Sequence, residues 1–315
     1  MKVARALGEV QRDLNSVVTV GTFDGVHLAH REILRDVVSR ARSRKGRSVV
    51  VTLHPHPKEV VASTKGAVKL LSTLEERVAL MAEMGVDLLF VVNFTFEFSR
   101  LTPREFYRTY VVNGVGVSEV IVGYDHMFGR DRQAGIEELL RMGQEFEFSV
   151  FAVHPFTVEG ETVSSTLIRR ALMAGDVERA RRFLGYPYRL GGTIVPGDGR
   201  GKSIGFPTAN IMLENDRKVV PGNGVYAVGV RLGEWQYHGM LNVGVRPTFA
   251  QDGGRTIEVH IFDFSRDVYG ERVEVEFLGR LRDERKFANV EELINQLGKD
   301  KEQSLRVIAG HVTIS

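Results

Sequence analysis

The N-terminal half of the chain alternates between short apolar runs and amphipathic helical patterns, which restricts the fold more than any other feature. Between the runs the apolar residues recur at helical spacing, as where Ile33, Leu34 and Val37 share one face. This alternation predicts an α/β domain with a parallel sheet covered by helices on both faces. The apolar runs that we expect to be strands are residues 17–20, 49–53, 88–92, 120–123 and 148–153.

Two helix starts in this half carry capping signals. Ser72 is followed three residues later by Glu75, and Thr102 is followed by Glu105, with Pro103 at the favoured first helical position. We expect the first of these helices to run from about residue 72 to Gly85.

The second half of the chain has a different pattern. From about Tyr188, runs with a period of two residues replace the helical ones, and glycine and proline turns separate them. This pattern predicts a small antiparallel β-barrel, followed by a C-terminal helix after residue 290. Two short helices, 165–174 and 176–184, are expected to link the halves, with Gly175 between them. We therefore predict domains at residues 1–186 and 187–315.

The segment 21–30, GTFDGVHLAH, joins the first predicted strand to the first predicted helix. A helix N-terminus offers unpaired N–H groups and a partial positive charge, and glycine permits close approach of the backbone to a ligand. The segment therefore predicts a phosphate site of a nucleotide. The candidate residues are Gly21, Phe23, Asp24, Gly25, His27 and His30.

Two other interpretations of these histidines are open. An isolated H-x-x-H is more often a solvated helix cap than a ligand site. Histidine is also a common metal ligand, and His54, His56 and His126 follow other predicted strands. The local spacing of a zinc site is absent, however, so we favour phosphate binding. A further anion site is suggested where Ser164, Ser165 and Thr166 precede Arg169 at a helix start, although an ordinary N-cap has the same pattern.

The composition excludes several classes of protein. The 315 residues suffice for about two domains, and 43% hydrophobic and 26% charged residues are ordinary for a globular protein. No apolar stretch approaches the roughly 20 residues of a membrane span. A net charge of +2 argues against a nucleic-acid partner, and the absence of cysteine excludes disulfides. We expect a cytoplasmic protein without a membrane or nucleic-acid partner.

A second site is indicated in the C-terminal half. The glycine-rich loop at 197–202 can bring N–H groups and positive charge onto phosphates through Gly199, Arg200, Gly201 and Lys202, although it lacks Walker P-loop spacing. Thr208 and Asn210 share one face of a strand and offer hard oxygen ligands for magnesium. Glu258 and His260 share the face opposite to Ile257 and Val259. That face is either solvated or the ligand-bearing mouth of the barrel.

The N-terminal half resembles the adenylyltransferase half of the bacterial bifunctional riboflavin kinase/FAD synthetases, a Rossmann-like nucleotidyltransferase domain. The segments that carry the resemblance are 21–30, 54–57, 123–129, 164–169 and 172–188. It implies that an FMN phosphate attacks the α-phosphorus of ATP and releases pyrophosphate. His27 and His30 would stabilise the phosphates, Arg169 would hold the pyrophosphate, and Asp125 would contact the nucleotide. Asp24 would lie near the substrates.

One position departs from the family motif, because Ala29 stands where the motif has glycine. A methyl group there could crowd the phosphate, although alanine is compatible with helical backbone. We expect reduced fit rather than abolished activity.

The C-terminal half resembles riboflavin kinase over several long segments in the family's order: 199–210, 224–227, 242–249, 258–264, 269–270 and 281–287. The resemblance implies that Glu258 accepts the proton of the riboflavin 5′-hydroxyl, which attacks the γ-phosphorus of ATP. Thr208 and Asn210 would hold Mg²⁺ between the phosphates. The flavin pocket would include Asn242, Arg246 and Arg282.

The prediction is therefore a bifunctional enzyme that uses MgATP to make FMN from riboflavin and then FAD from FMN. One alternative is a riboflavin kinase whose N-terminal half is impaired by Ala29. A second alternative is a non-catalytic flavin-binding protein, against which Glu258, Thr208 and Asn210 together argue. The sequence leaves self-association open.

Overall fold

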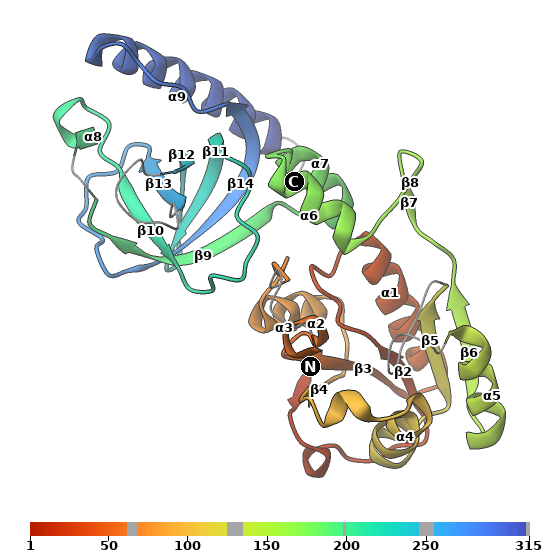
Figure 1. Ribbon diagram of the computed structural model, residues 1–315. Coiled ribbons are helices and arrows are strands. Elements are labelled where there is room, and N and C mark those ends of the chain that lie inside the picture. Colours follow the sequence, from red (N-terminus) through yellow and green to blue (C-terminus); the bar gives the residue numbers. More distant parts are fainter. Residues whose placement is uncertain (62–67, 125–134, 198–199, 246–254, 313–315) are drawn as a thin grey trace. The chain divides into compact units, whose positions relative to one another are not determined.

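The computed structural model describes residues 1–61, 68–124, 135–197, 200–245 and 255–312, apart from the side chains of Arg200, Lys202 and Val312. The chain divides into two compact units, Met1–Ser165 and Thr166–Ser315, called unit 1 and unit 2 below (Figure 1). No helix in the described ranges is long and apolar enough to cross a membrane.

Unit 1 contains a six-stranded parallel sheet with strand order β1-β4-β3-β2-β5-β6. The five predicted strands are confirmed, and the three-residue β1 joins them at one edge. The strands are β1 (Lys2–Ala4), β2 (Ser16–Val20), β3 (Arg47–His54), β4 (Leu88–Asn93), β5 (Glu119–Gly123) and β6 (Ser149–Val153). A separate two-stranded ribbon pairs β7 (Thr157–Val158) with β8 (Glu161–Thr162).

Helices cover both faces of this sheet, as the alternating pattern predicts. On one face, Leu34 of α1 (Leu28–Ser43) and Met81 of α3 (Leu74–Glu83) pack with the strands, and on the other face Tyr107 and Leu139 do so. The helical segments of unit 1 are η1 (Leu7–Glu9), α1 (Leu28–Ser43), α2 (Pro57–Val61), α3 (Leu74–Glu83), η2 (Phe98–Arg100), α4 (Pro103–Phe106), the π-helix η3 (Tyr107–Val115) and α5 (Ile136–Phe146).

The capping box of α4 is confirmed, whereas that of α3 lies one residue later than predicted. Thr73 caps α3, since its hydroxyl accepts from the Glu76 amide and the Glu76 carboxylate accepts from the Thr73 amide. Ser72 cannot take this role because its hydroxyl and amide are engaged with Asp24 and Gly25, which lie far away in the sequence.

Unit 2 begins within α6 (Ser165–Met173), continues through α7 (Val177–Leu184) and then forms a closed six-stranded barrel. Gly175 lies between the two helices with a φ of +81°, as expected of a stop. The ladders of the barrel are all antiparallel, in the order β10-β13-β12-β11-β14-β9. Its strands are β9 (Tyr188–Val195), β10 (Ala209–Leu213), β11 (Gly224–Leu232), β12 (Trp235–Val245), β13 (Arg255–Ile261) and β14 (Arg272–Arg282).

The C-terminal helix α9 (Val290–Val312) packs on the barrel (Figure 1). Ile308 of this helix joins a buried cluster with Met240, Phe262 and Leu278. The glycine-rich loop differs from a simple loop, because the short helix α8 (Arg200–Ser203) forms within it. The predicted fold class is thus confirmed for both units: an α/β parallel-sheet domain, then an antiparallel barrel with a C-terminal helix.

Candidate active sites

The segment 21–30, called the nucleotide turn below, connects β2 to α1 at the carboxyl edge of the parallel sheet. Its backbone is unusual, since Phe23 and Val26 have φ values of +48° and +36° and Gly25 has +84°. Residues other than glycine rarely adopt such φ values, and backbone strain of this kind tends to occur at ligand sites.

His27 and His30 lie together at the start of α1. His27 is the N-cap, and its Nδ1 accepts a hydrogen bond from the His30 amide at 3.3 Å. The two rings stack with centroids 3.5 Å apart, and Phe23 meets His30 edge-on at 5.0 Å. The cap interpretation of His27 and the phosphate interpretation are compatible, because only one ring nitrogen serves the cap.

His30 is held in the neutral form. Burial, followed by the charges of His27 and Arg77, lowers its pKa well below the ordinary value. The His30 Nδ1 is buried and finds no hydrogen-bond partner among the described residues. A buried polar atom without a partner is costly, so the site is suited to a ligand that supplies one.

Asp24 is placed inside the protein rather than on its surface, with 2% of its area exposed. Its carboxylate accepts hydrogen bonds from the amides of Leu71 at 3.0 Å and Ser72 at 2.9 Å. The Asp24 carbonyl accepts one from the Ser165 hydroxyl at 3.0 Å. In this structure Asp24 and Ser165 therefore fix the shape of the nucleotide turn.

Ala29 occupies the first turn of α1 without backbone strain, since its φ is not among the positive values. Gly21 continues the sheet, because its amide donates to the Val51 carbonyl at 3.0 Å. Of the other predicted residues, Ser164 belongs to unit 1, whereas Thr166 and Arg169 lie on the part of α6 in unit 2. Asp125 lies outside the described residues.

The histidines after β3 show no ligand-like cluster. His54 ends the strand, and burial and the Arg77 charge lower its pKa. His56 accepts a hydrogen bond from the Lys58 amide at 3.2 Å. Within the described ranges there is no group of three or more His, Cys, Asp or Glu side chains that could hold a metal ion. His126 lies outside those ranges.

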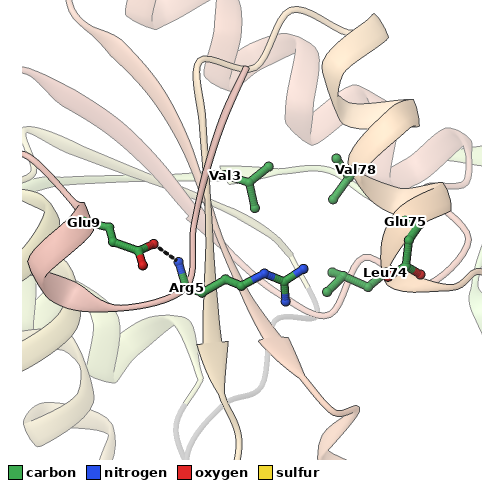
Figure 2. Close-up of a pocket in the computed structure, with 6 residues that line it drawn as sticks. All are labelled: Val3, Arg5, Glu9, Leu74, Glu75 and Val78. Carbon is green, nitrogen blue, oxygen red and sulfur yellow. Dashed lines mark hydrogen bonds between the residues drawn. The ribbon is translucent and has the colours of Figure 1, made fainter.

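A different cavity of unit 1, about 350 Å³, lies between β1, η1 and α3. Figure 2 shows Arg5 extending toward Leu74 and Glu75, while the Arg5 amide donates to Glu9. The lining residues are Val3, Arg5, Glu9, Leu74, Glu75 and Val78. None of them is a predicted site residue, and they present one cation beside two carboxylates over an apolar floor. This chemistry does not favour a phosphate.

In unit 2 four of the predicted residues, Asn210, Asn242, Glu258 and Arg282, lie in one row across the barrel, called the barrel row below. Glu258 of β13 is paired with Asn210 of β10 on one side and with Asn242 of β12 on the other. The row continues through Val225 of β11 to Arg282 of β14. Residues paired across a ladder point to the same face, so the register brings these side chains together.

Four residues of the barrel row, Val225, Asn242, Glu258 and Arg282, line a cavity of about 230 Å³ between the barrel and α9, whereas Asn210 is not one of its lining residues. Its lining contains five residues expected from the sequence: Thr208, Asn242, Glu258, His260 and Arg282. It also contains residues that were not predicted as site residues, among them Val225, Glu284, Arg285, Phe287 and Leu297. The face shared by Glu258 and His260 therefore lines a cavity.

Hydrogen bonds hold the polar walls of this cavity. The Arg282 guanidinium contacts Asp300 of α9, with 2.7 Å between Nη2 and Oδ2 and 3.0 Å between Nε and Oδ1. The side-chain amide of Asn242 donates a hydrogen bond to the Glu284 carboxylate at 3.2 Å. His260 Nδ1 lies 2.7 Å from the Pro207 carbonyl, and burial lowers the pKa of its ring.

Gly197 and Gly201 approach the two predicted metal ligands closely. A Cβ atom at Gly197 would lie 2.0 Å from the Asn210 side-chain nitrogen, and one at Gly201 would lie 3.3 Å from the Thr208 hydroxyl. At position 197 the Asn210 side chain could move aside, but a Cβ atom at Gly201 would also lie 2.2 Å from the Phe206 carbonyl oxygen, so glycine is needed at position 201. Gly199, the side chains of Arg200 and Lys202, and Arg246 lie outside the described part of the chain.

Comparisons with known proteins match both halves of the chain. A profile of FAD synthetase matches residues 9–167, and a profile of riboflavin kinase matches residues 184–308. A Listeria monocytogenes bifunctional riboflavin kinase/FMN adenylyltransferase is 39% identical over 292 residues, which cover 93% of this chain and 92% of the relative.

This chain belongs to the bifunctional riboflavin kinase/FMN adenylyltransferase family. The Escherichia coli K12 member is 37% identical over 287 residues, covering 90% of each chain. A Streptococcus pneumoniae crystal structure described as a macrolide-efflux protein has a TM-score of 0.86 and 35% identity, and covers 96% of this chain and 98% of its own. The resemblance derived from the motifs is confirmed, with an adenylyltransferase half preceding a kinase half.

Proposed function

We propose that unit 2 phosphorylates riboflavin to FMN and that unit 1 adenylylates FMN to FAD, each with MgATP as the second substrate. The observation that carries the kinase half is the barrel row, which places one carboxylate between two amides at the mouth of a cavity. The observation that carries the other half is the stacked histidine pair at a strained helix start.

For the kinase reaction we assign Glu258 as the general base. Its carboxylate accepts the proton of the riboflavin 5′-hydroxyl while that oxygen attacks the γ-phosphorus of ATP. The bond from the γ-phosphorus to the β,γ-bridging oxygen breaks, and ADP leaves. Phosphoryl transfer depends mainly on positioning and charge stabilisation, so a single orienting carboxylate suffices.

Magnesium fits this site as a companion of ATP. Mg²⁺ is usually bound by one or two protein oxygens together with phosphates and water, not by an all-protein cage. Thr208 and the amide of Asn210 offer such oxygens near Glu258, and no acidic metal cluster occurs among the described residues. We assign Asn242 and Arg282, with Arg246, to the flavin pocket and the loop 199–202 to the phosphates.

For adenylyl transfer, an oxygen of the FMN phosphate attacks the α-phosphorus of ATP. The bond to the α,β-bridging oxygen breaks and pyrophosphate leaves, so no proton must be moved. Catalysis then requires alignment and charge neutralisation. We assign the binding and alignment of the phosphates to His27, His30 and the first amides of α1, and charge neutralisation of pyrophosphate to Arg169. Ser164, Ser165, Thr166 and Asp125 complete the proposed nucleotide contacts, and the linker helices are assigned with unit 1 to a domain 1–186.

Product analysis tests this proposal directly. Purified protein is incubated with riboflavin and MgATP, and riboflavin, FMN and FAD are separated over time. We expect FMN to appear first and FAD to follow. Accumulation of FMN without FAD would contradict the adenylyltransferase half and favour the kinase-only alternative with Ala29 as its cause. Flavin binding without turnover would contradict both halves.

A further inference from the structure

Arg77 of α3 is an almost fully buried cation behind the nucleotide turn, with 5% of its area exposed. Its Nη1 donates to the Thr22 carbonyl at 2.5 Å and to the Thr52 hydroxyl at 3.3 Å. Its Nε donates to the Thr73 carbonyl at 3.4 Å. One side chain thus joins the turn after β2, the carboxyl end of β3 and the start of α3.

These three acceptors are all neutral oxygens. Among the residues that the structure describes, no carboxylate forms an ion pair with Arg77. Burial lowers the pKa of its guanidinium, with Asp24 opposing this effect most strongly, but an arginine remains charged at neutral pH. A buried charge without a close counter-charge is costly, and such groups concentrate at functional sites.

The same end of α3 holds the other side of the nucleotide turn. The Ser72 hydroxyl accepts a hydrogen bond from the Gly25 amide at 2.7 Å, and the Ser72 amide donates to Asp24 at 2.9 Å. Phe23 lies between Thr22 and Asp24 in a left-handed conformation and packs against His30. A movement of the Thr22 carbonyl would therefore be transmitted to the His30 ring.

Arg77 also acts on the histidines through its charge. Burial and the charges of His27 and Arg77 all lower the pKa of His30. Among the charges that change the pKa of His54, that of Arg77 has the largest effect and lowers it. The charges of Glu59 and Glu75 act against Arg77 and raise the pKa of His54. A cation at this place disfavours protonated histidines while the site is empty and attracts the phosphates of a nucleotide.

We propose that Arg77 is a positioning residue for adenylyl transfer: it holds the nucleotide turn in shape through Thr22 and gives the histidine pair a fixed positive surrounding. This inference rests on the proposed function of unit 1. The role is not that of a catalytic residue, because the side chain acts through Thr22 and the histidines.

The test compares Arg77→Met with Arg77→Lys, and Arg35→Met is the matched control. Arg35 is an exposed cation of α1 that forms an ion pair with Glu32 on the same helix. Arg77→Met should lower kcat for FAD formation about 100-fold, the cost of a misplacement of about 1 Å. The rate of riboflavin phosphorylation in the same preparation should not change. Arg77→Lys keeps the charge but loses the fork that spans two acceptors, so its kcat should also fall.

A merely structural role is distinguished by the titration of His30. NMR of ¹³C-labelled histidine rings, with His30 assigned through His30→Asn, should show its pKa raised in Arg77→Met. That pKa should stay low in Arg77→Lys and in Arg35→Met.

Wild-type kcat and KM for FAD formation in Arg77→Met would overturn the proposal, as would an equal loss in Arg35→Met. If Arg77→Met does not fold, Arg77→Lys decides: an unchanged kcat there would refute the positioning role. If the wild-type protein makes no FAD at all, the proposed function fails, while the pKa of His30 still reports on Arg77.

Discussion

The nucleotide turn of unit 1 and the barrel row of unit 2 both gather polar side chains, but from different distances along the chain. The turn takes its histidines from one contiguous segment, positioned by a strand end and a helix start. The barrel row takes one residue from each of five strands, which only the hydrogen-bond register brings together. A local site depends on backbone conformation, whereas a distributed site depends on pairing.

The two sites also differ in whether their cation is paired with a carboxylate. Unit 1 places the buried cation of Arg77 and His30, whose pKa is lowered by burial, where phosphates are expected, and among the described residues no carboxylate forms an ion pair with that cation. Unit 2 pairs its cation, since Arg282 binds the carboxylate of Asp300. Substitutions in the two units should therefore affect the two activities separately.

The largest expected effect belongs to Glu258→Gln. Loss of a general base usually costs about 10²–10⁴ in rate, so riboflavin phosphorylation should slow by that factor. FAD formation from added FMN should be retained, and Glu234→Gln, in an exposed turn of the barrel, should change neither rate. An equal fall in both activities would show that the sites are not separate.

In unit 1, His27→Asn should lower FAD formation by about 10²–10³, the usual cost of one transition-state hydrogen-bond donor. Asparagine keeps a capping oxygen for α1, so thermal stability should change little, whereas His27→Ala should lose about 1 kcal/mol of stability in addition. Steady-state rates and thermal midpoints separate the two effects. A large stability loss in His27→Asn would indicate that the cap is the main role of His27.

Asp300→Ala tests whether the distributed site depends on α9. Asp300 is 1% exposed and accepts hydrogen bonds from Arg282 and Gln296. Breaking this buried pair should destabilise unit 2 by about 3 kcal/mol and raise KM of the kinase reaction. Asp283→Ala removes an exposed ion pair with Arg280 and should cost at most about 1 kcal/mol. Similar losses in the two variants would contradict the importance of the Arg282 pair.

The pH dependence of stability should differ between wild type and His30→Asn. The pKa of His30 in the folded state lies well below its value in the unfolded chain, about 6.5. As the pH falls through this window, the unfolded chain takes up a proton that the folded protein resists, so the free energy of unfolding decreases. Hydrogen exchange of α1 amides between pH 7 and 5 should show a steeper loss in the wild type. Equal slopes would exclude His30 as the group responsible.

The smallest effect is expected for Ala29→Gly, which restores the family motif. Since Ala29 is unstrained in the first turn of α1, FAD formation should change little and stability should fall by at most about 1 kcal/mol. A large rise in FAD formation would support the alternative in which Ala29 impairs the N-terminal half.

Much of the fold could be predicted because its signals are local. Apolar runs identified the five longer strands of unit 1, and capping signals identified helix starts. The residues of the nucleotide turn are neighbours in sequence. The short strand β1 was missed because three residues carry no periodicity. The cap of α3 was misplaced by one residue because Ser72 is bound to Asp24, which only the tertiary structure reveals.

The supporting residues of both sites could not be found in this way. Arg77 resembles any charged residue on an amphipathic helix, and its burial depends on where the nucleotide turn lies. Glu284, Arg285 and Phe287 fall in a segment that was noted for its family resemblance, but their place in the cavity follows from the packing of α9. Side chains that act through other side chains leave no pattern of their own.

The strand orders of the two sheets have a consequence for association between molecules. An open sheet ends in unpaired N–H and C=O groups that can template another chain, whereas a closed barrel has no such edge. In unit 1 the two open edges are β1 and β6, and β1 is only three residues long and carries Lys2. Short, charged edge strands resist intermolecular pairing, so fibril-like growth through the parallel sheet is discouraged at β1. The longer edge strand β6 is the edge at which another chain could pair.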